Sequence, residues 1–68
     1  MPKQNQSLIR MPEVLRRIGY GKAWIYKLIS LERFPKPVKI GSRSIAFVES
    51  EIDEWINSRI EESRKEVA

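Results

Sequence analysis

Four carboxylates lie close together in the sequence, at Glu49, Glu51, Asp53 and Glu54. Such a cluster can bind a metal ion or perform acid–base chemistry, but catalysis needs a second group held beside it in a pocket. The acids are better explained as residues at the start of a helix, where negative charge complements the positive end of the helix dipole.

Other reactive side chains are scarce. The 68-residue chain contains no cysteine and no histidine, which excludes disulfides, Cys/His zinc sites, cysteine nucleophiles and imidazole catalysis. The serines therefore have no histidine base to activate them. We expect a protein that is not an enzyme and that needs neither a metal ion nor a cofactor.

The charge is divided unevenly along the chain, whose net charge is +4. Residues 1–48 contain ten basic and two acidic residues, a net charge of +8, whereas residues 49–68 contain three basic and seven acidic residues, a net charge of −4. A strongly basic half is the electrostatic footprint of a nucleic-acid-binding protein. The alternative is a solvated surface that happens to be basic.

Two short helices are predicted in the basic half. Pro12 suits the first position of a helix that runs to Ile18 and ends at Gly19. After the turn Gly19–Gly21, a second helix is predicted over Lys22–Glu32. Its apolar stripe has the helical spacing i, i+3, i+4 and consists of Ile25, Leu28 and Ile29.

A β-hairpin and a third helix should follow. Pro35 and Pro37 force an extended backbone, and two short strands around the turn Gly41–Ser44 predict a hairpin. A capping box, Ser50–Asp53, predicts a helix from Glu51 to about Arg64. The residues of the predicted core are Val14, Leu15, Ile18, Ile25, Leu28, Ile29, Phe34, Ile40, Phe47, Ile52, Trp55 and Ile56.

Two short helices joined by a glycine-containing turn are the signature of a helix-turn-helix motif, whose second helix enters the major groove of DNA. The residues of the second helix available for such contacts are Lys22, Ala23, Trp24, Tyr26, Lys27 and Ser30. The hairpin would act as a wing, with Lys39, Ser42, Arg43 and Ser44 near phosphates or the minor groove. Arg16 and Arg17 of the first helix are candidate contacts to the DNA backbone.

Two aromatic or charged side chains have competing interpretations. Trp24 could stack on a sugar or base, or it could simply cover the turn between the two helices. Arg59 falls within the apolar stripe of the last helix, where it should extend toward solvent or pair with an acid such as Glu62.

Four segments resemble the AlpA family of prophage DNA-binding regulators: Met11–Leu15, Ile25–Ile29, Arg33–Arg43 and Glu49–Ile56. The resemblance covers about residues 8–60 and implies a winged helix-turn-helix of the MerR or excisionase type. The chain departs from the family at three positions, since Gly21, Trp24 and Phe47 stand where the family often has Ser, Thr and Trp.

The predicted fold is therefore mostly α-helical with a small β-hairpin, in the order helix, turn, helix, hairpin, helix. We expect a disordered tail over residues 1–7, one domain over residues 8–64 and a frayed end over residues 65–68. The longest apolar run, Ile45–Val48, is far shorter than the roughly 20 residues of a membrane span. Residues 1–7 also lack the apolar stretch of a signal peptide, so we expect a cytoplasmic protein that does not bind membranes.

The expected function is that of a sequence-specific transcriptional regulator of a prophage or integrative element, with double-stranded DNA as its partner. An excisionase-type recombination directionality factor is the nearest alternative. A small anti-regulator that binds another protein is an alternative of a different class. Because one small domain contacts only a short DNA segment, we expect several copies on adjacent sites, or a partner such as an integrase or RNA polymerase.

Overall fold

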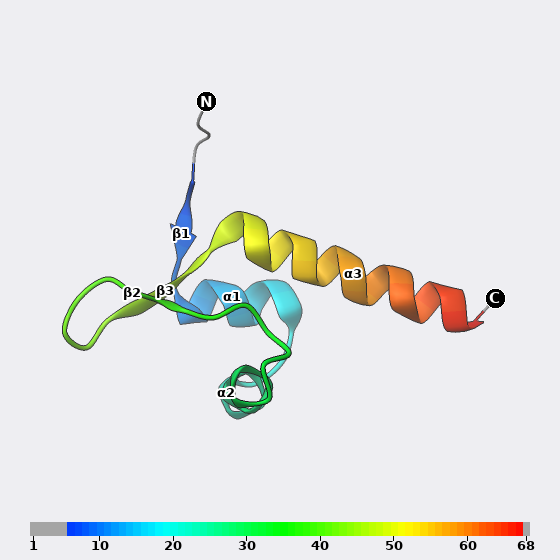
Figure 1. Cartoon of the computed structure of the whole chain (residues 1–68), viewed down its shortest axis with the longest axis horizontal. Coiled ribbons are helices and arrows are strands. Elements are labelled where there is room, and N and C mark those ends of the chain that lie inside the picture. Colours follow the sequence, from blue (N-terminus) through cyan, green and yellow to red (C-terminus); the bar gives the residue numbers. More distant parts are fainter. Residues whose placement is uncertain (1–5, 68) are drawn as a thin grey trace.

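The computed structural model describes residues 6–67 and shows a mostly helical chain with a small antiparallel sheet (Figure 1). Most of the predicted N-terminal tail (residues 1–5) and the last residue, Ala68, lie outside the described residues. The elements, in chain order, are β1 (Leu8–Ile9), α1 (Met11–Ile18), α2 (Lys22–Ser30), β2 (Val38–Lys39), β3 (Ile45–Val48) and α3 (Glu49–Val67). The predicted order of helix, helix, hairpin and helix is confirmed.

The sheet has three strands in the order β1-β3-β2. The predicted hairpin pairs Val38 with Ala46 and Lys39 with Ile45. The sequence did not predict that β1 would join this sheet, where it pairs antiparallel with β3. The backbone N–H of Glu49 also donates to the carbonyl of Ser7 at 2.7 Å, so this residue of the predicted tail bonds to the start of α3.

The turn between α1 and α2 is made by two glycines with different tasks. Gly19 has a left-handed φ of 85° and donates its N–H to the Leu15 carbonyl at 2.7 Å, which closes α1. Gly21 is the N-cap of α2 and has extended backbone angles. Because only glycine adopts the left-handed conformation at little cost, Gly19 is the residue that sets the sharp change of direction.

Helix α2 ends two residues earlier than predicted, at Ser30. Glu32 lies outside it with a left-handed φ of 60°. Its N–H donates to the Ile29 carbonyl at 3.0 Å, and the N–H of Arg33 donates to the Leu28 carbonyl at 2.9 Å. This pair of bonds is a Schellman motif, and it occurs here without the usual glycine.

One small hydrophobic core joins the elements. Its buried members are Val14, Ile25, Phe34, Phe47 and Ile52. The ring of Phe34 packs edge to face against Phe47 and Trp55, with centroid distances of 5.8 and 4.9 Å. Eleven of the twelve predicted core residues belong to this cluster or pack against it.

The exception in the predicted core is Ile40, which is 45% exposed. It follows the last residue of β2, and its N–H closes the hairpin loop by donating to the Ser44 carbonyl at 2.9 Å. The alternation of apolar and polar residues in the hairpin predicted a buried side chain, but at this point the hairpin has already left the core. Ala46, which was not predicted, is fully buried instead.

The predicted capping box at the start of α3 is wrong. Strand β3 continues directly into α3 at Glu49, so Ser50 is the second residue of the helix rather than its cap. The carbonyl of Ser7 accepts from the N–H of Glu49, which gives one of the free N–H groups at the start of the helix a partner from the segment before β1.

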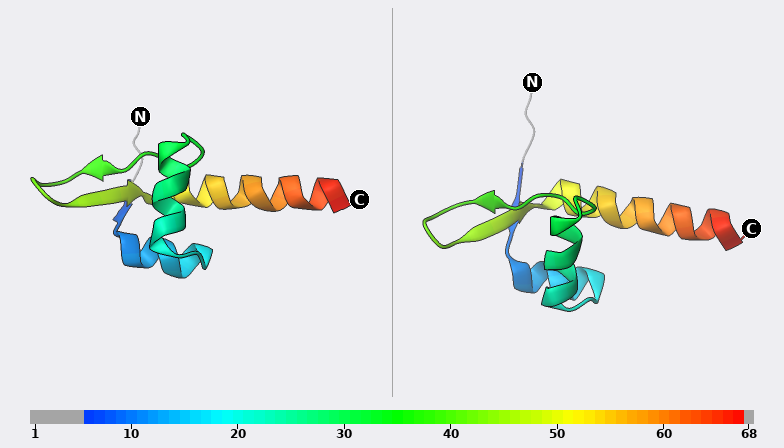
Figure 2. Two further views of the ribbon diagram at one scale, coloured as in Figure 1. Left: turned by 90° about the horizontal axis from the view of Figure 1, so that it is seen from below. Right: turned by 60° about the horizontal axis from the view of Figure 1, so that its bottom comes forward.

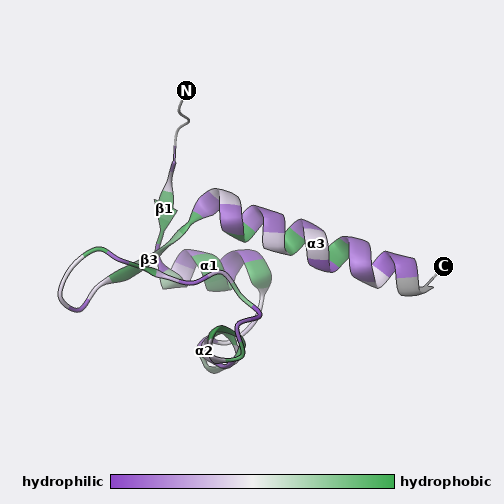
Figure 3. Ribbon diagram, viewed as in Figure 1, coloured by the Kyte–Doolittle hydropathy of each residue, from purple (hydrophilic) through white to green (hydrophobic). Residues whose placement is uncertain are grey.

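Helix α3 continues to Val67, beyond its predicted end near Arg64. The hairpin and α3 extend to opposite sides of α2 (Figure 2). The distal part of α3 lies beyond the rest of the molecule and carries mostly hydrophilic residues (Figure 3). Among the described residues, no helix is long and apolar enough to cross a membrane.

A cluster of charges ties α1 to the start of α3. The guanidinium of Arg17 donates to Glu13 and Glu49, each at 2.7 Å, and lies 3.5 Å from Asp53. Arg16 also donates to both carboxylate oxygens of Glu13. Hydrogen bonds from Arg16 and Arg17 lower the pKa of Glu13 from 4.5 to about 2. The carboxylates of Glu13 and Glu49 in turn raise the pKa of Arg17.

The low pKa of Glu13 predicts an acid-sensitive contribution to stability. A carboxylate with a lowered folded-state pKa stabilises the fold fully above its unfolded pKa and loses that contribution as the pH falls. For Glu13 the loss should occur between about pH 4.5 and pH 2. Thermal melts of the wild type and Glu13→Gln across this range should differ most above pH 4.5 and converge toward pH 2. Parallel melting curves at every pH would contradict this account.

The left-handed residue at the end of α2 predicts a stabilising substitution. Glu32→Gly should raise the free energy of unfolding by about 1 kcal/mol, because an L-residue pays a steric cost in this conformation that glycine does not. For a domain of this size the melting temperature should rise by about 4–8 °C. Glu32→Ala is the matched control, because it removes the same charge and keeps the strain. Equal melting temperatures for the two variants would show that the conformation costs nothing.

Candidate nucleic-acid interface

Helix α2 presents a polar face away from the core. Ile25 is buried and Leu28 and Ile29 are half-buried, which fixes the rotation of the helix about its axis. The predicted contact residues on the remaining surface are all exposed: Lys22, Ala23, Trp24, Tyr26, Lys27 and Ser30. The structure therefore brings these six side chains together on one helix and leaves them accessible.

Internal contacts already involve three of these side chains. The hydroxyl of Ser30 donates to the Lys27 carbonyl at 2.8 Å, so only its acceptor lone pairs remain available. The ammonium of Lys27 lies 5.6 Å from the ring centroid of Trp24, a cation–π geometry. The Trp24 ring also packs edge to face on Tyr20 at 5.9 Å. Trp24 therefore does cover the turn, and the contact leaves it 41% exposed.

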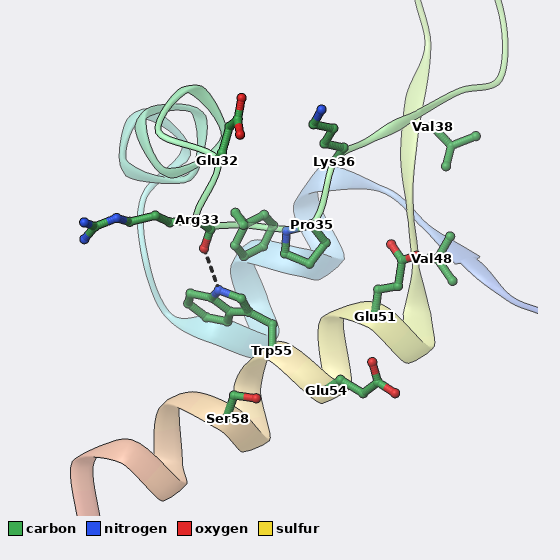
Figure 4. Close-up of a pocket in the computed structure, with 11 residues that line it drawn as sticks. Glu32, Arg33, Pro35, Lys36, Val38, Val48, Glu51, Glu54, Trp55 and Ser58 are labelled. Carbon is green, nitrogen blue, oxygen red and sulfur yellow. Dashed lines mark hydrogen bonds between the residues drawn. The ribbon is translucent and has the colours of Figure 1, made fainter. Parts of the chain in front are cut away.

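The segment after α2 is anchored to α3. The indole Nε1 of Trp55 donates to the Arg33 carbonyl at 2.8 Å (Figure 4). The next residue, Phe34, is buried in the core. Together these contacts fix the C-terminal end of α2 relative to α3. The sequence predicted Trp55 as a core residue. It did not predict this hydrogen bond, because the acceptor is a backbone carbonyl 22 positions away in the sequence.

A hollow of about 710 Å³ lies beside this anchor. Its charged lining residues are of both signs, with Glu32, Glu51 and Glu54 against Arg33 and Lys36 (Figure 4). Within residues 6–67, no group of three or more acidic residues is placed to hold a metal ion. The charges of the described lining residues therefore favour neither an anion nor a cation, and these residues do not form a metal site.

The hairpin presents the second predicted group of contact residues. Lys39, Ser42 and Arg43 are exposed, and Ser44 is half-buried where it closes the loop. The hairpin projects from the body of the molecule on the side opposite to α3 (Figure 2). Its basic side chains are therefore separated from the acidic side chains of α3.

The two arginines of α1 differ sharply. The side chain of Arg16 is 72% exposed and pairs only with Glu13 among the described residues, so it remains accessible to a phosphate. The side chain of Arg17 is 25% exposed and is surrounded by three carboxylates. Because the charge of Arg17 already joins α1 to α3, we expect Arg16 to be the stronger contact to the DNA backbone of the two. Only Glu13, four residues earlier on the same helix, could have signalled this from the sequence.

Known proteins that resemble this chain include regulators encoded by prophages. A family model described as Prophage CP4-57 regulatory protein (AlpA) matches residues 7–60. The chain is 34% identical over 55 residues to the uncharacterized protein ORF88 of Enterobacteria phage P4, a match that covers 81% of this chain and 62% of that protein. The chain thus spans less than two thirds of that relative.

A second relative has a described activity. The chain is 33% identical over 58 residues to the DNA-binding transcriptional activator AlpA of Escherichia coli strain K12, with 76% of this chain and 83% of that protein covered. No solved structure matches the chain significantly. Because the family model covers most of its length, the chain belongs to the AlpA family of prophage regulatory proteins.

Proposed function

We propose that this chain is a sequence-specific DNA-binding transcriptional regulator of a prophage or integrative element. The observation that carries the proposal is the exposed face of α2, which bears Lys22, Tyr26 and Lys27. A helix of this kind can enter the major groove, where Lys contacts guanine or phosphate and Ala23 can contact a thymine methyl group. The E. coli relative, described as a DNA-binding transcriptional activator, supports the assignment.

In this proposal the domain is a winged helix-turn-helix and the β2–β3 hairpin is its wing. Lys39 and Arg43 would contact phosphates or the minor groove beside the segment bound by α2, with Ser42 and Ser44 close by. Arg16 would contact the backbone from α1. The acidic residues of α3 support this orientation, because DNA would repel them.

One such domain covers a short DNA segment, which gives little sequence discrimination by itself. We therefore propose that several copies bind adjacent sites, or that the protein binds beside an integrase or RNA polymerase. An excisionase-type role would use the same DNA surface. A promoter–reporter assay and an excision assay, each run with and without the protein in its native host, separate the two roles. No effect in either assay would leave only the protein-binding anti-regulator.

The wing assignment predicts a uniform electrostatic effect. With about four to six phosphate contacts, log K should fall with log salt at a slope of roughly −4 to −5. Lys39→Ala and Arg43→Ala should each weaken binding to all sequences and flatten the slope by about one. Arg64→Ala, an exposed arginine on α3, is the matched control and should change neither quantity. If Arg43→Ala behaves like Arg64→Ala in a salt titration, the hairpin is not a wing.

The recognition assignment predicts a sequence-dependent effect. Tyr26→Ala and Lys27→Ala should each lose about 1–3 kcal/mol of specific binding, with a smaller loss on non-specific DNA. Because both side chains are exposed, stability should change by no more than about 0.5 kcal/mol. Competition gel shifts with specific and random duplexes measure the ratio of specific to non-specific affinity. If this ratio is unchanged in both folded variants, the placement of α2 in the major groove is wrong.

A further inference from the structure

We propose that the groove between α2 and α3 is a docking site for an acidic amphipathic helix of another protein. The groove consists of two adjoining hollows, of about 220 and about 180 Å³, which share Tyr20, Trp55 and Arg59 as lining residues. One wall comes from the end of α1, the turn after it, α2 and the segment that follows α2, and the other comes from the middle of α3. The inference does not depend on DNA binding.

The groove gathers large apolar side chains that the fold does not cover. Eight large hydrophobic residues are exposed in the described part of the chain, and four of them line this groove. They are Tyr20 (52% exposed), Trp24 (41%), Leu31 (53%) and Ile60 (41%). Contiguous exposed apolar surface rimmed by polar residues marks interaction sites in soluble proteins. A groove between two helices suits an apolar helix face with anchors at i, i+3, i+4 and i+7.

The charged residues that line the groove are all arginines, and two of the three pair with acids outside it. Its charged lining residues are Arg17, Arg33 and Arg59, and no carboxylate lines it. Arg17 is neutralised by α1 and α3, whereas Arg33 forms no ion pair with any described residue. The Arg33 side chain points away from Glu51 and Glu54 in Figure 4. Arg59 pairs with Glu62 at 3.3 Å, but both side chains are largely exposed, so a ligand carboxylate can replace this weak contact.

Apolar walls with an arginine rim select a partner that offers apolar anchors flanked by acids. A second copy of this chain does not meet that description. On its α3, the acids beside the apolar residues Ile56 and Ile60 are Glu49 and Asp53, which already bind Arg17. The exposed acids Glu51, Glu54 and Glu61 lie on the opposite face of the helix. The fitting occupant is therefore a segment of a different protein.

The test uses a synthetic amphipathic helix of about 14 residues, or four turns, with leucines at i, i+3 and i+7, glutamates beside the leucines and alanines elsewhere to support the helix. Fluorescence anisotropy of the labelled peptide should report saturable binding to the wild-type protein. Leu31→Ser and Arg33→Glu should each weaken it about tenfold. The matched controls are Leu8→Ser, an equally exposed leucine on β1, and Arg10→Glu, an exposed arginine before α1; both should bind like the wild type. A peptide with lysines in place of its glutamates should not bind.

Three outcomes would overturn the proposal. The first is absence of binding by the acidic peptide to folded protein, and the second is equal weakening by the groove variants and their controls. The third is a concentration-dependent self-association, seen by sedimentation velocity, that Leu31→Ser abolishes, because the groove would then belong to a second copy. Gel shifts with the same variants keep this result separate from the DNA proposal: Leu31→Ser and Arg33→Glu should retain specific DNA binding, and a parallel loss would assign the groove to DNA.

Discussion

The position of α2 depends on the segment that follows it. Ile25 is the one fully buried residue of this helix, and Leu28 and Ile29 pack against the core with part of their surface exposed, so contacts outside the helix help to hold its direction. Two contacts supply the constraint: Phe34 inserts between Phe47 and Trp55, and the Trp55 indole donates to the Arg33 carbonyl. In so small a domain the core is limited, and a few well-placed contacts must hold a helix whose other face is exposed.

A few charged residues likewise hold the helices together. Arg17 forms ion pairs with carboxylates of both helices at the α1–α3 junction. The acids at the start of α3 therefore serve two purposes, since they complement the helix dipole and neutralise an arginine. The exposed lysines of α2 and the exposed Lys39 and Arg43 of the hairpin therefore lie on elements other than α3, which carries most of the exposed acids.

The sequence predicted the elements well because their signals are local. Local signals come from Pro12, Gly19 and the spacing of Ile25, Leu28 and Ile29, each of which determines structure within one or two turns of chain.

The features that the sequence did not predict are tertiary contacts. The pairing of β1 with β3, the hydrogen bond from Glu49 to Ser7 and the ion pair between Arg17 and Glu49 all join residues more than 30 positions apart. The predicted burial of Ile40 was wrong for a related reason. Its place in the alternating pattern of the strand is apolar, but no core residue lies against that part of the hairpin. The exposed residues of α2 could be named from helical periodicity, whereas the α2–α3 groove required knowing which helices face each other.

The direct passage from β3 into α3 sets a strict rule on chain length. Val48 ends the strand and Glu49 begins the helix, with no residue between them. One inserted residue would turn α3 by about 100° relative to the sheet, which would carry Glu49 away from Arg17 and Trp55 away from Arg33. The loop over residues 41–43 has no such coupling, because its ends are held by the hairpin alone. Insertions and deletions among relatives should therefore accumulate in that loop and be absent at the strand–helix junction.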